Sequence, residues 1–446
     1  MTTSHPTFSP TLTHPTSFHL GTGHALYTHL LPHLLHTTQH SLILVTCFWA
    51  SSPTSHLLSS FLRQLSASRG PQSKIHIRIC VSSLSALQKA FHTSSPHGTL
   101  LPPETLGLPP PDEIPGVELR IKSIFLRPCH VLHGKYIIQD GRNVWFPSAN
   151  VSWEDWGEGC IGFENGDGEG KDKESGLAGD LLRYWEGIWD GDGTMSVPSA
   201  PALVPPSILD SRSPNPNTSD LGPGADLLTT LKFQSLPPQT RTLLLPHPHS
   251  AYNPLHIFLP SILSSNTTPP PTPLNTFLLT HLSTASHSIQ IYTPNLTYRP
   301  LITALEHALQ RGVTIRVVLP RKMMVFEQLL TAGTLSEIEV WRLQRRIRRL
   351  AARHDEETGR MGMLEVVWFD GQAVEAGDGI RDGEGGNTGR PSKLHLKLTI
   401  IDEAITVLGS GNMDRASWVT SQEVGVAVFS EEVAKRVGEV VRRVYG

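Results

Sequence analysis

The sequence predicts an α/β protein built from a duplicated domain, with two β-sheet lobes flanked by helices and related by a pseudo-twofold axis. Three observations favour this fold class. Strand-like apolar runs alternate with helix-like segments along the 446 residues, and the elements of the first half recur in the same order in the second half. A polar pattern of His, Lys, Asp and Asn, with successive members two, five and ten positions apart, also occurs once in each half.

Each half is expected to contain a helix running into a strand, a second helix, two strands, the polar pattern, a further strand and a closing helix. Pro300 suits the first turn of a helix over 299–312, and Gly312 suits its end. The first half carries these elements at 28–46, 56–68, 74–81, 116–125, 159–164 and 178–190, and the second half at 276–293, 299–312, 313–320, 362–370, 423–429 and 430–446.

Composition marks the boundary between the two copies. Residues 1–190 are expected to form the N-terminal lobe, 191–274 a flexible connector rich in Pro and Ser, and 275–446 the C-terminal lobe. The glycine-rich stretches 164–176 and 377–392 are predicted to be surface loops.

Charge and targeting signals favour a cytoplasmic protein, with peripheral contact to a membrane left open. The formal net charge is −3, so any contact with an anionic partner must come from a local patch. No charged residue precedes Arg63, which argues against a signal peptide, and no apolar run reaches the roughly 20 residues of a membrane span. The absence of paired spacings predicts reduced, mostly buried thiols at Cys47, Cys80, Cys129 and Cys160.

The repeated polar pattern is the strongest functional signal. Two positions apart on an extended strand, the histidine and lysine point to the same face, and they offer one titratable nitrogen and one cation. The asparagine adds an amide donor from a turn of small residues. Such a set suits a phosphoryl group, and two copies that face each other would form one composite active site. The pattern consists of His133, Lys135, Asp140 and Asn150 in the first copy, and of His395, Lys397, Asp402 and Asn412 in the second.

These two stretches resemble the H-x-K-x-x-x-x-D motifs of the phospholipase D superfamily, and the repeated order of elements extends the resemblance to most of the chain. The second copy is the closer match, with Asp414-Arg415, Ser417 and Glu423 after the motif. The first copy departs from the pattern, because Pro147 replaces a glycine of the turn and a tryptophan-rich run, 153–156, replaces the Asp-Arg-x-Ser sequence.

The resemblance implies phosphodiester chemistry through a covalent phosphohistidine, without a metal or another cofactor. It assigns His133 as the nucleophile and His395 as the general acid and base, an order that is open to reversal. The motif aspartates would orient their surroundings more than touch substrate. The lysines and asparagines would bind phosphate, and Glu158 and Glu423 would orient the histidines, supported by Ser148 and Ser410 in the turns.

The sequence does not decide which substrate is used, or whether the reaction is hydrolysis or transfer. A phospholipid is favoured, a nucleic acid is the alternative, and a non-catalytic phosphate-binding or lipid-binding scaffold is the third reading; a monomer is expected. An arginine-rich helix over 341–353 is either a solvated face or an anionic-surface contact through Arg345, Arg346 and Arg349. Trp145, Trp153 and Trp156 are interpreted as packing rather than as base-stacking platforms.

Overall fold

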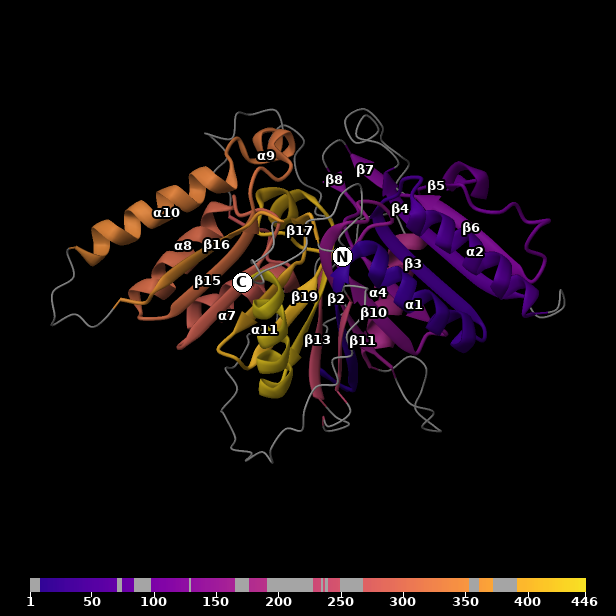
Figure 1. Cartoon of the computed structure of the whole chain (residues 1–446), viewed down its shortest axis with the longest axis horizontal. Helices are drawn as coiled ribbons and strands as arrows, with labels where there is room; N and C mark the ends of the chain where they lie inside the picture. The colour runs from indigo at the N-terminus through magenta and orange to yellow at the C-terminus, as the bar shows by residue number, and fades with distance from the viewer. Residues whose placement is uncertain are drawn as a thin grey trace, which may run out of the picture.

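The computed structural model has two lobes, each built on a mixed β-sheet and packed side by side (Figure 1). It describes residues 9–69, 74–83, 98–127, 130–164, 176–190, 228–233, 236, 240–248, 268–352, 361–371 and 391–446.

The first sheet belongs mainly to the N-terminal half. Its central strands β3, β4 and β6 run parallel, and β9, β10, β11 and β2 continue it in antiparallel order. The strand order is β12 (Thr229–Lys232), β2 (Pro15–Thr22), β11 (Trp156–Phe163), β10 (Asn143–Pro147), β9 (Tyr136–Gln139), β3 (Ser41–Phe48), β4 (Ile75–Ser83), β6 (Val117–Ser123) and β5 (Thr99–Leu101), with β17 (Lys393–Leu394) paired to β11.

The second sheet repeats this arrangement over eight strands, and the edge strand β5 of the first sheet has no counterpart in it among the described residues. Its parallel strands β14, β15 and β16 take the places of β3, β4 and β6. The order is β1 (Thr11–Thr13), β13 (Thr240–His247), β20 (Glu423–Phe429), β19 (Ile405–Gly409), β18 (Leu398–Ile401), β14 (Ser288–Tyr292), β15 (Thr314–Pro320) and β16 (Leu364–Phe369). A small separate sheet pairs β7 (Phe125–Arg127) with β8 (His130–Val131).

Each sheet receives an edge strand from the other part of the chain. The N-terminal β1 pairs with β13 in the second sheet, whereas β12 pairs with β2 in the first. Both β12 and β13 lie inside the predicted connector 191–274, so this stretch contributes ordered strands to both lobes. The division of the chain at residues 190 and 275 stays a prediction.

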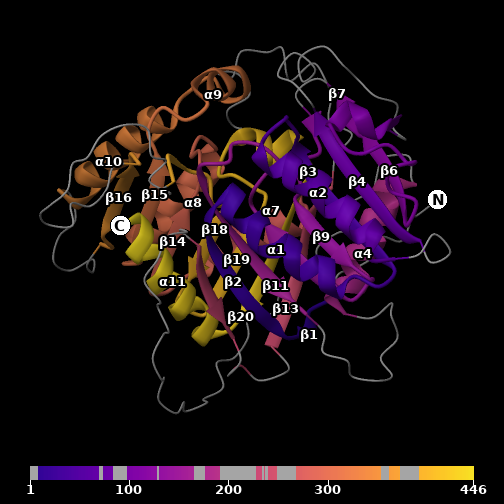
Figure 2. The same ribbon diagram turned by 45° about the vertical axis from the view of Figure 1, so that its right-hand side comes forward.

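The helices form three layers around the two sheets (Figures 1 and 2). Helices α1 and α2 cover the outer face of the first sheet, α7, α8 and α10 cover the outer face of the second, and α4 and α11 lie between the sheets. Their bounds are α1 (Gly23–Thr37), α2 (Pro53–Ala67), α4 (Leu177–Trp189), α7 (Pro273–Thr284), α8 (Arg299–Gln310), α9 (Val325–Ala332), α10 (Ser336–Ala351) and α11 (Glu431–Tyr445).

Local chemistry sets the helix ends. Ser52 caps α2 by accepting from the Ser55 backbone N–H, and Pro53 occupies the first turn. Ser430 accepts from the Val433 N–H at the start of α11, where acidic side chains fill the first turn and basic ones the last, as the helix dipole favours.

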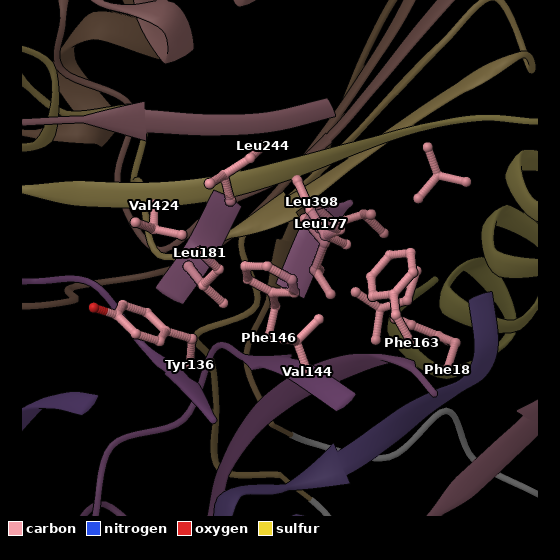
Figure 3. Close-up of a cluster of buried hydrophobic side chains, with 14 of the residues drawn as sticks. Phe18, Tyr136, Val144, Phe146, Phe163, Leu177, Leu181, Leu244, Leu398 and Val424 are labelled. Carbon is pink, nitrogen blue, oxygen red and sulfur yellow. The ribbon is translucent and has the colours of Figure 1, made fainter. Parts of the chain in front are cut away.

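Three apolar cores hold the layers together. One lies outside each sheet, and the third fills the space between the sheets with side chains from both lobes. Figure 3 shows Phe146 and Tyr136 of the first sheet beside Leu398 and Val424 of the second. Because this shared core is buried only when both lobes are present, the lobes are expected to behave as one structural unit.

The predicted fold class is confirmed: the chain is an α/β protein with two mixed sheets flanked by helices. Cys47, Cys80 and Cys160 are buried and form no disulfide with one another, in agreement with the predicted reduced thiols, and Cys129 lies outside the described residues. The loop predictions for 164–176 and 377–392 also fall almost entirely outside them.

Candidate active site

Each motif segment crosses to the opposite lobe before its histidine. The His133 backbone N–H donates to the Gln422 carbonyl over 2.8 Å, and the Gln422 N–H donates to Val131 over 2.9 Å. At the equivalent position of the second copy, β17 pairs in parallel with β11, and the His395 backbone N–H donates to the Gly157 carbonyl over 2.8 Å. The histidine of each copy therefore lies one residue from the glutamate of the other copy along the paired strand.

Both histidines contact these glutamates through Nδ1. His133 Nδ1 lies 2.9 Å from both carboxylate oxygens of Glu423, and His395 Nδ1 lies 2.6 Å from Oε1 of Glu158. A carboxylate on Nδ1 fixes the ring and directs Nε2 to the opposite side. The sequence indicated the two glutamates, but it did not predict that each serves the histidine of the other copy.

A buried serine holds each glutamate in place. Ser148 Oγ donates to Glu158 over 2.5 Å, and Ser410 Oγ donates to Glu423 over 2.5 Å. Each hydroxyl also accepts a backbone N–H from the residue after the glutamate, over 3.0 Å. Both turn serines that were singled out in the sequence therefore contact the carboxylates directly.

The two motif lysines are buried beside the histidines. Lys135 Nζ donates to the His133 carbonyl over 2.9 Å, and Lys397 Nζ donates to the His395 carbonyl over 2.5 Å. Lys397 Nζ also lies 2.8 Å from His395 Nδ1. Two buried cations are costly without nearby negative charge, and the buried carboxylates of Glu158 and Glu423 act on them from within the cluster.

The electrostatics differ between the two halves. Burial opposes ionisation of Glu423, but His133 and Lys135 overcome it and hold its pKa at about 2. Burial lowers the pKa of His133, and Glu423 offsets only part of this effect. At neutral pH the His133 imidazole is therefore neutral, with its Nδ1–H donated to an ionised carboxylate and its Nε2 lone pair available as a nucleophile or base.

Around His395, burial raises the pKa of Glu158 to about 7 and lowers the pKa of Lys397 to about 7. The opposite charges of the two groups act against both shifts. Protons around His395 can therefore be exchanged near neutral pH. The charge of Lys397 also lowers the pKa of His133, and Lys135 acts on Glu158. The ionisable groups of both copies thus influence one another as one cluster.

The motif aspartates lie at the far ends of their strands. Asp140 accepts from the backbone N–H groups of Gln39, His40 and Ser41 over 2.7–2.8 Å. Asp402 accepts in the same way from 286–288 over 2.8–3.2 Å. At ~3.3 Å per residue, seven residues of extended chain separate each aspartate from its histidine by roughly 20 Å. Both carboxylates fasten the start of a central strand, and the structure does not bring them to the histidines.

The two motif asparagines are buried but differ in their contacts. Asn150 Oδ1 accepts from the Phe48 N–H over 3.2 Å, which orients its amide. Asn412 Nδ2 instead donates to Asp414 over 3.1 Å. Asn412 and Lys397 line a cavity between α7 and the second sheet, so polar groups of the second motif reach this space. Its other lining residues are Leu274, Asn275, Leu278, Thr399, Val407, Gly409, Gly411, Met413, Ser417, Trp418 and Gly425.

An aromatic stack borders His395. The rings of Trp153 and Trp156 are parallel with centroids 4.6 Å apart, Phe48 stacks on Trp153, and Trp156 lies 4.9 Å from the His395 ring. Trp145 is separate from this stack and fully buried. The stack occupies the segment where the second copy has Asp414 and Arg415, so the two sides of the cluster are chemically different.

The predicted surface arginines lie on α10, outside this cluster. Arg345 lies over the Trp341 ring at 5.3 Å, and Arg346 is paired with Glu306 over 2.8 Å. Arg349 is exposed. Arg346 therefore faces α8 and differs from the other two arginines in having an acidic partner.

Within the described residues, no group of three or more His, Cys, Asp or Glu side chains is arranged to hold a metal ion. No helix in the described part of the chain has the length and apolar character that crossing a bilayer requires.

The chain is similar to known proteins in sequence over its C-terminal part and in fold over most of its length. Residues 278–445 match the family model described as the cardiolipin synthase, PLD-like domain. The fold is similar to that of a phosphatidylserine synthase from Haemophilus influenzae, with a TM-score of 0.53, 13% identity, and coverage of 96% of this chain and 86% of that one.

Two further solved structures each match less than half of the chain. The Nuc protein of Salmonella typhimurium, a phospholipase D family member, shows 17% identity and a TM-score of 0.26, covering 39% of this chain and 86% of its own. NucT from Helicobacter pylori shows 14% identity and a TM-score of 0.26, covering 46% of this chain and 94% of its own. A comparison with curated proteins gives no match.

Proposed function

We propose, from the premise that this chain carries a domain of the phospholipase D superfamily, that it is a phosphodiesterase that hydrolyses or transfers the phosphatidyl group of phospholipids. The observation that carries the proposal is the crossed pair of histidines, each held at Nδ1 by the glutamate of the other copy. This arrangement supplies two imidazoles to one cluster, and two are what a double displacement at phosphorus needs.

The reaction proceeds in two steps. His133 Nε2 attacks phosphorus, a phosphorus–nitrogen bond forms, and the bond to the leaving alcohol breaks while protonated His395 gives its proton to that oxygen. His395, now neutral, takes a proton from water or a second alcohol, whose oxygen attacks phosphorus and releases His133. The lowered pKa of His133 supports its role as the nucleophile, because that group must start neutral.

The buried cations stabilise the charge that develops on the phosphoryl oxygens. Lys135 and Lys397 are the buried lysines of the cluster, Asn412 lines a cavity together with Lys397, and Asn150 would supply the second amide. Preorganised charges in a site with little water are usually the largest contribution to such catalysis. Asp140 and Asp402 contribute by fixing the strands and do not touch the substrate.

A substrate panel with the purified full-length chain tests the proposal. Phosphatidylcholine, phosphatidylglycerol and cardiolipin are compared with single-stranded and double-stranded oligonucleotides, each with EDTA and without it. We expect turnover of at least one phospholipid that EDTA does not reduce. Turnover of oligonucleotides alone would assign the chain as a nuclease, and binding without turnover would assign it as a scaffold.

A further inference from the structure

Helix α9 carries an apolar face that the fold leaves exposed. Phe326, Leu329 and Leu330 are 81%, 48% and 59% exposed, and their spacing places them on one side of the helix. On the next helix, α10, Ile338 and Trp341 lie three positions apart and are 40% and 53% exposed. Large apolar side chains gathered on one surface, rather than scattered singly, mark an interaction site.

The opposite side of α9 is fastened by a buried glutamine. Gln328 Nε2 donates to the Met323 carbonyl over 2.5 Å, and its Oε1 accepts from the Ser336 N–H over 2.8 Å. These bonds join both ends of the segment 323–336. These hydrogen bonds fix α9 in place, so its exposed apolar face belongs to an anchored helix.

The segment that contains α9 lies at the rim of the active-site cluster. Lys393, two residues before His395, donates to the Arg321 carbonyl over 3.4 Å. At the other end of α9, Arg415 Nη1 donates to the Thr331 carbonyl over 3.2 Å. Arg415 follows Asp414, the partner of Asn412. Figure 1 shows α9 at the upper edge of the molecule, above β17.

The charge next to the apolar face is positive. Arg345, Arg348 and Arg349 are exposed on the turns of α10 that follow Trp341. Two acidic residues at the start of α10 have local partners: buried Glu339 pairs with Arg342, and Glu337 accepts the Lys322 N–H over 2.7 Å. An apolar face flanked by cations is complementary to the surface of an anionic bilayer.

We propose that α9 and the exposed side of α10 form a docking surface for a membrane that contains anionic phospholipid. Phe326, Leu329, Leu330, Ile338 and Trp341 enter the boundary between headgroups and acyl chains, and the three arginines contact headgroup phosphates. Docking brings the rim formed by Lys393 and Arg415 to the membrane, so a lipid phosphodiester reaches the histidines without leaving the bilayer surface. This inference rests on the proposed lipid function.

The test measures vesicle binding and turnover separately in the full-length chain. Phe326→Ser/Leu330→Ser removes the apolar contact, and Arg345→Gln/Arg348→Gln/Arg349→Gln removes the charge. Leu12→Ser/Leu100→Ser is the matched control, because these leucines are 61% and 65% exposed on other elements. Lys74→Gln/Arg120→Gln/Arg443→Gln is the charge control. Binding to vesicles of mixed phosphatidylglycerol and phosphatidylcholine is followed by sedimentation, and turnover with bis-p-nitrophenyl phosphate, which needs no membrane.

We expect each docking variant to bind these vesicles at least about tenfold more weakly, while both controls bind like the parent and all five proteins turn over the soluble diester equally. Salt should weaken binding of the parent but affect the arginine variant little. Equal binding by all variants would overturn the docking surface. A parent dimer that Phe326→Ser/Leu330→Ser converts to a monomer would overturn it as well, by assigning the face to a second copy.

Failure of the proposed function gives a different result. If the parent binds vesicles through α9 but turns over no phospholipid in vesicles or detergent micelles, the docking surface stands and the lipid activity falls. If the parent turns over lipid in micelles while the docking variants bind vesicles as the parent does, the activity stands and the docking surface falls.

Discussion

His133 and His395 share a motif but differ in their surroundings. His133 pairs with a glutamate that stays ionised at neutral pH, whereas His395 contacts both Glu158 and Lys397 and borders the tryptophan stack. A nucleophile and a general acid need different protonation states, and this asymmetry is consistent with a division of roles.

Replacing each histidine by asparagine separates the two roles. With a p-nitrophenyl diester, whose leaving group needs no proton, His395→Asn should complete the first step and stall before hydrolysis. A phosphoryl adduct should then accumulate on His133 and be detected by intact mass and acid-sensitive labelling, whereas His133→Asn should form none. An adduct on His395 in the His133→Asn variant would reverse the assignment, and unchanged turnover in both variants would refute the mechanism.

The pH profile should respond to Glu423. The carboxylate raises the pKa of His133, so Glu423→Gln should lower it further, and the acid limb of kcat/KM should move to lower pH. Loss of the fixed tautomer should also reduce the maximal kcat/KM by about 10²-fold. Stopped assays over a pH series check both effects, with Glu113→Gln at an exposed ion pair as the control. An acid limb that stays in place or rises would show that Glu423 does not set the charge of His133.

At the scale of secondary-structure elements, each motif aspartate joins the end of one strand to the start of another. Asp402 lies in the turn between β18 and β19 and binds the backbone that enters β14, and Asp140 does the same for β3 in the first sheet. The pKa of Asp402 is lowered, because the backbone N–H groups of 286–288 outweigh the opposing effect of burial.

Stability should therefore depend on this carboxylate at acidic pH. A lowered folded-state pKa means that the stabilisation is present above the unfolded value of about 3.9 and is lost as the pH falls through the folded value. Asp402→Asn should lower the free energy of unfolding at neutral pH by about 1–3 kcal/mol and reduce the dependence of Tm on pH below about 5. Thermal unfolding across that pH range is the measurement. Asp140→Asn should also lower the free energy of unfolding at neutral pH, because its carboxylate accepts from three backbone N–H groups. A lower kcat with unchanged Tm would contradict the structural role of both aspartates.

The sequence predicted the elements that carry local signals and missed those that depend on distant partners. Periodicity located α2, α8 and α11 within a few residues, the repeated motif indicated the histidines and lysines, and the family resemblance indicated the glutamates. The pairing of β1 with β13 and of β12 with β2 left no local signal, because short strands in Pro-rich surroundings look like connectors until their partners are known. The crossing of each histidine to the opposite glutamate was not predictable for the same reason. The exposed face of α9 escaped notice because its periodicity is that of an ordinary buried helix face.

At the scale of the whole molecule, the swapped edge strands and the shared core make the two halves mutually dependent. A C-terminal piece alone would expose Leu398 and Val424 of the central core and would lack Glu158 for His395. Each half is therefore expected to need the other both for stability and for a complete site.

Co-expression of the pieces 1–210 and 211–446 tests this dependence. They should copurify, because β12 of the second piece pairs in the first sheet and β1 of the first piece pairs in the second. Activity should appear only in the mixture. Two separately soluble and stable pieces, or activity in one of them alone, would be incompatible with the shared core.

The crossed glutamates have a consequence for how such a protein can diverge. In a symmetric dimer of identical single-copy chains, every substitution would appear on both sides of the twofold axis. A substitution that suits the histidine in one role would therefore also surround the histidine in the other role. In the fused chain a substitution appears once. Joining the copies therefore removes the requirement for symmetry while each half still completes the other, and Trp153 and Trp156 can stand opposite Asp414 and Arg415. Duplication therefore gives this site two sides that can diverge independently.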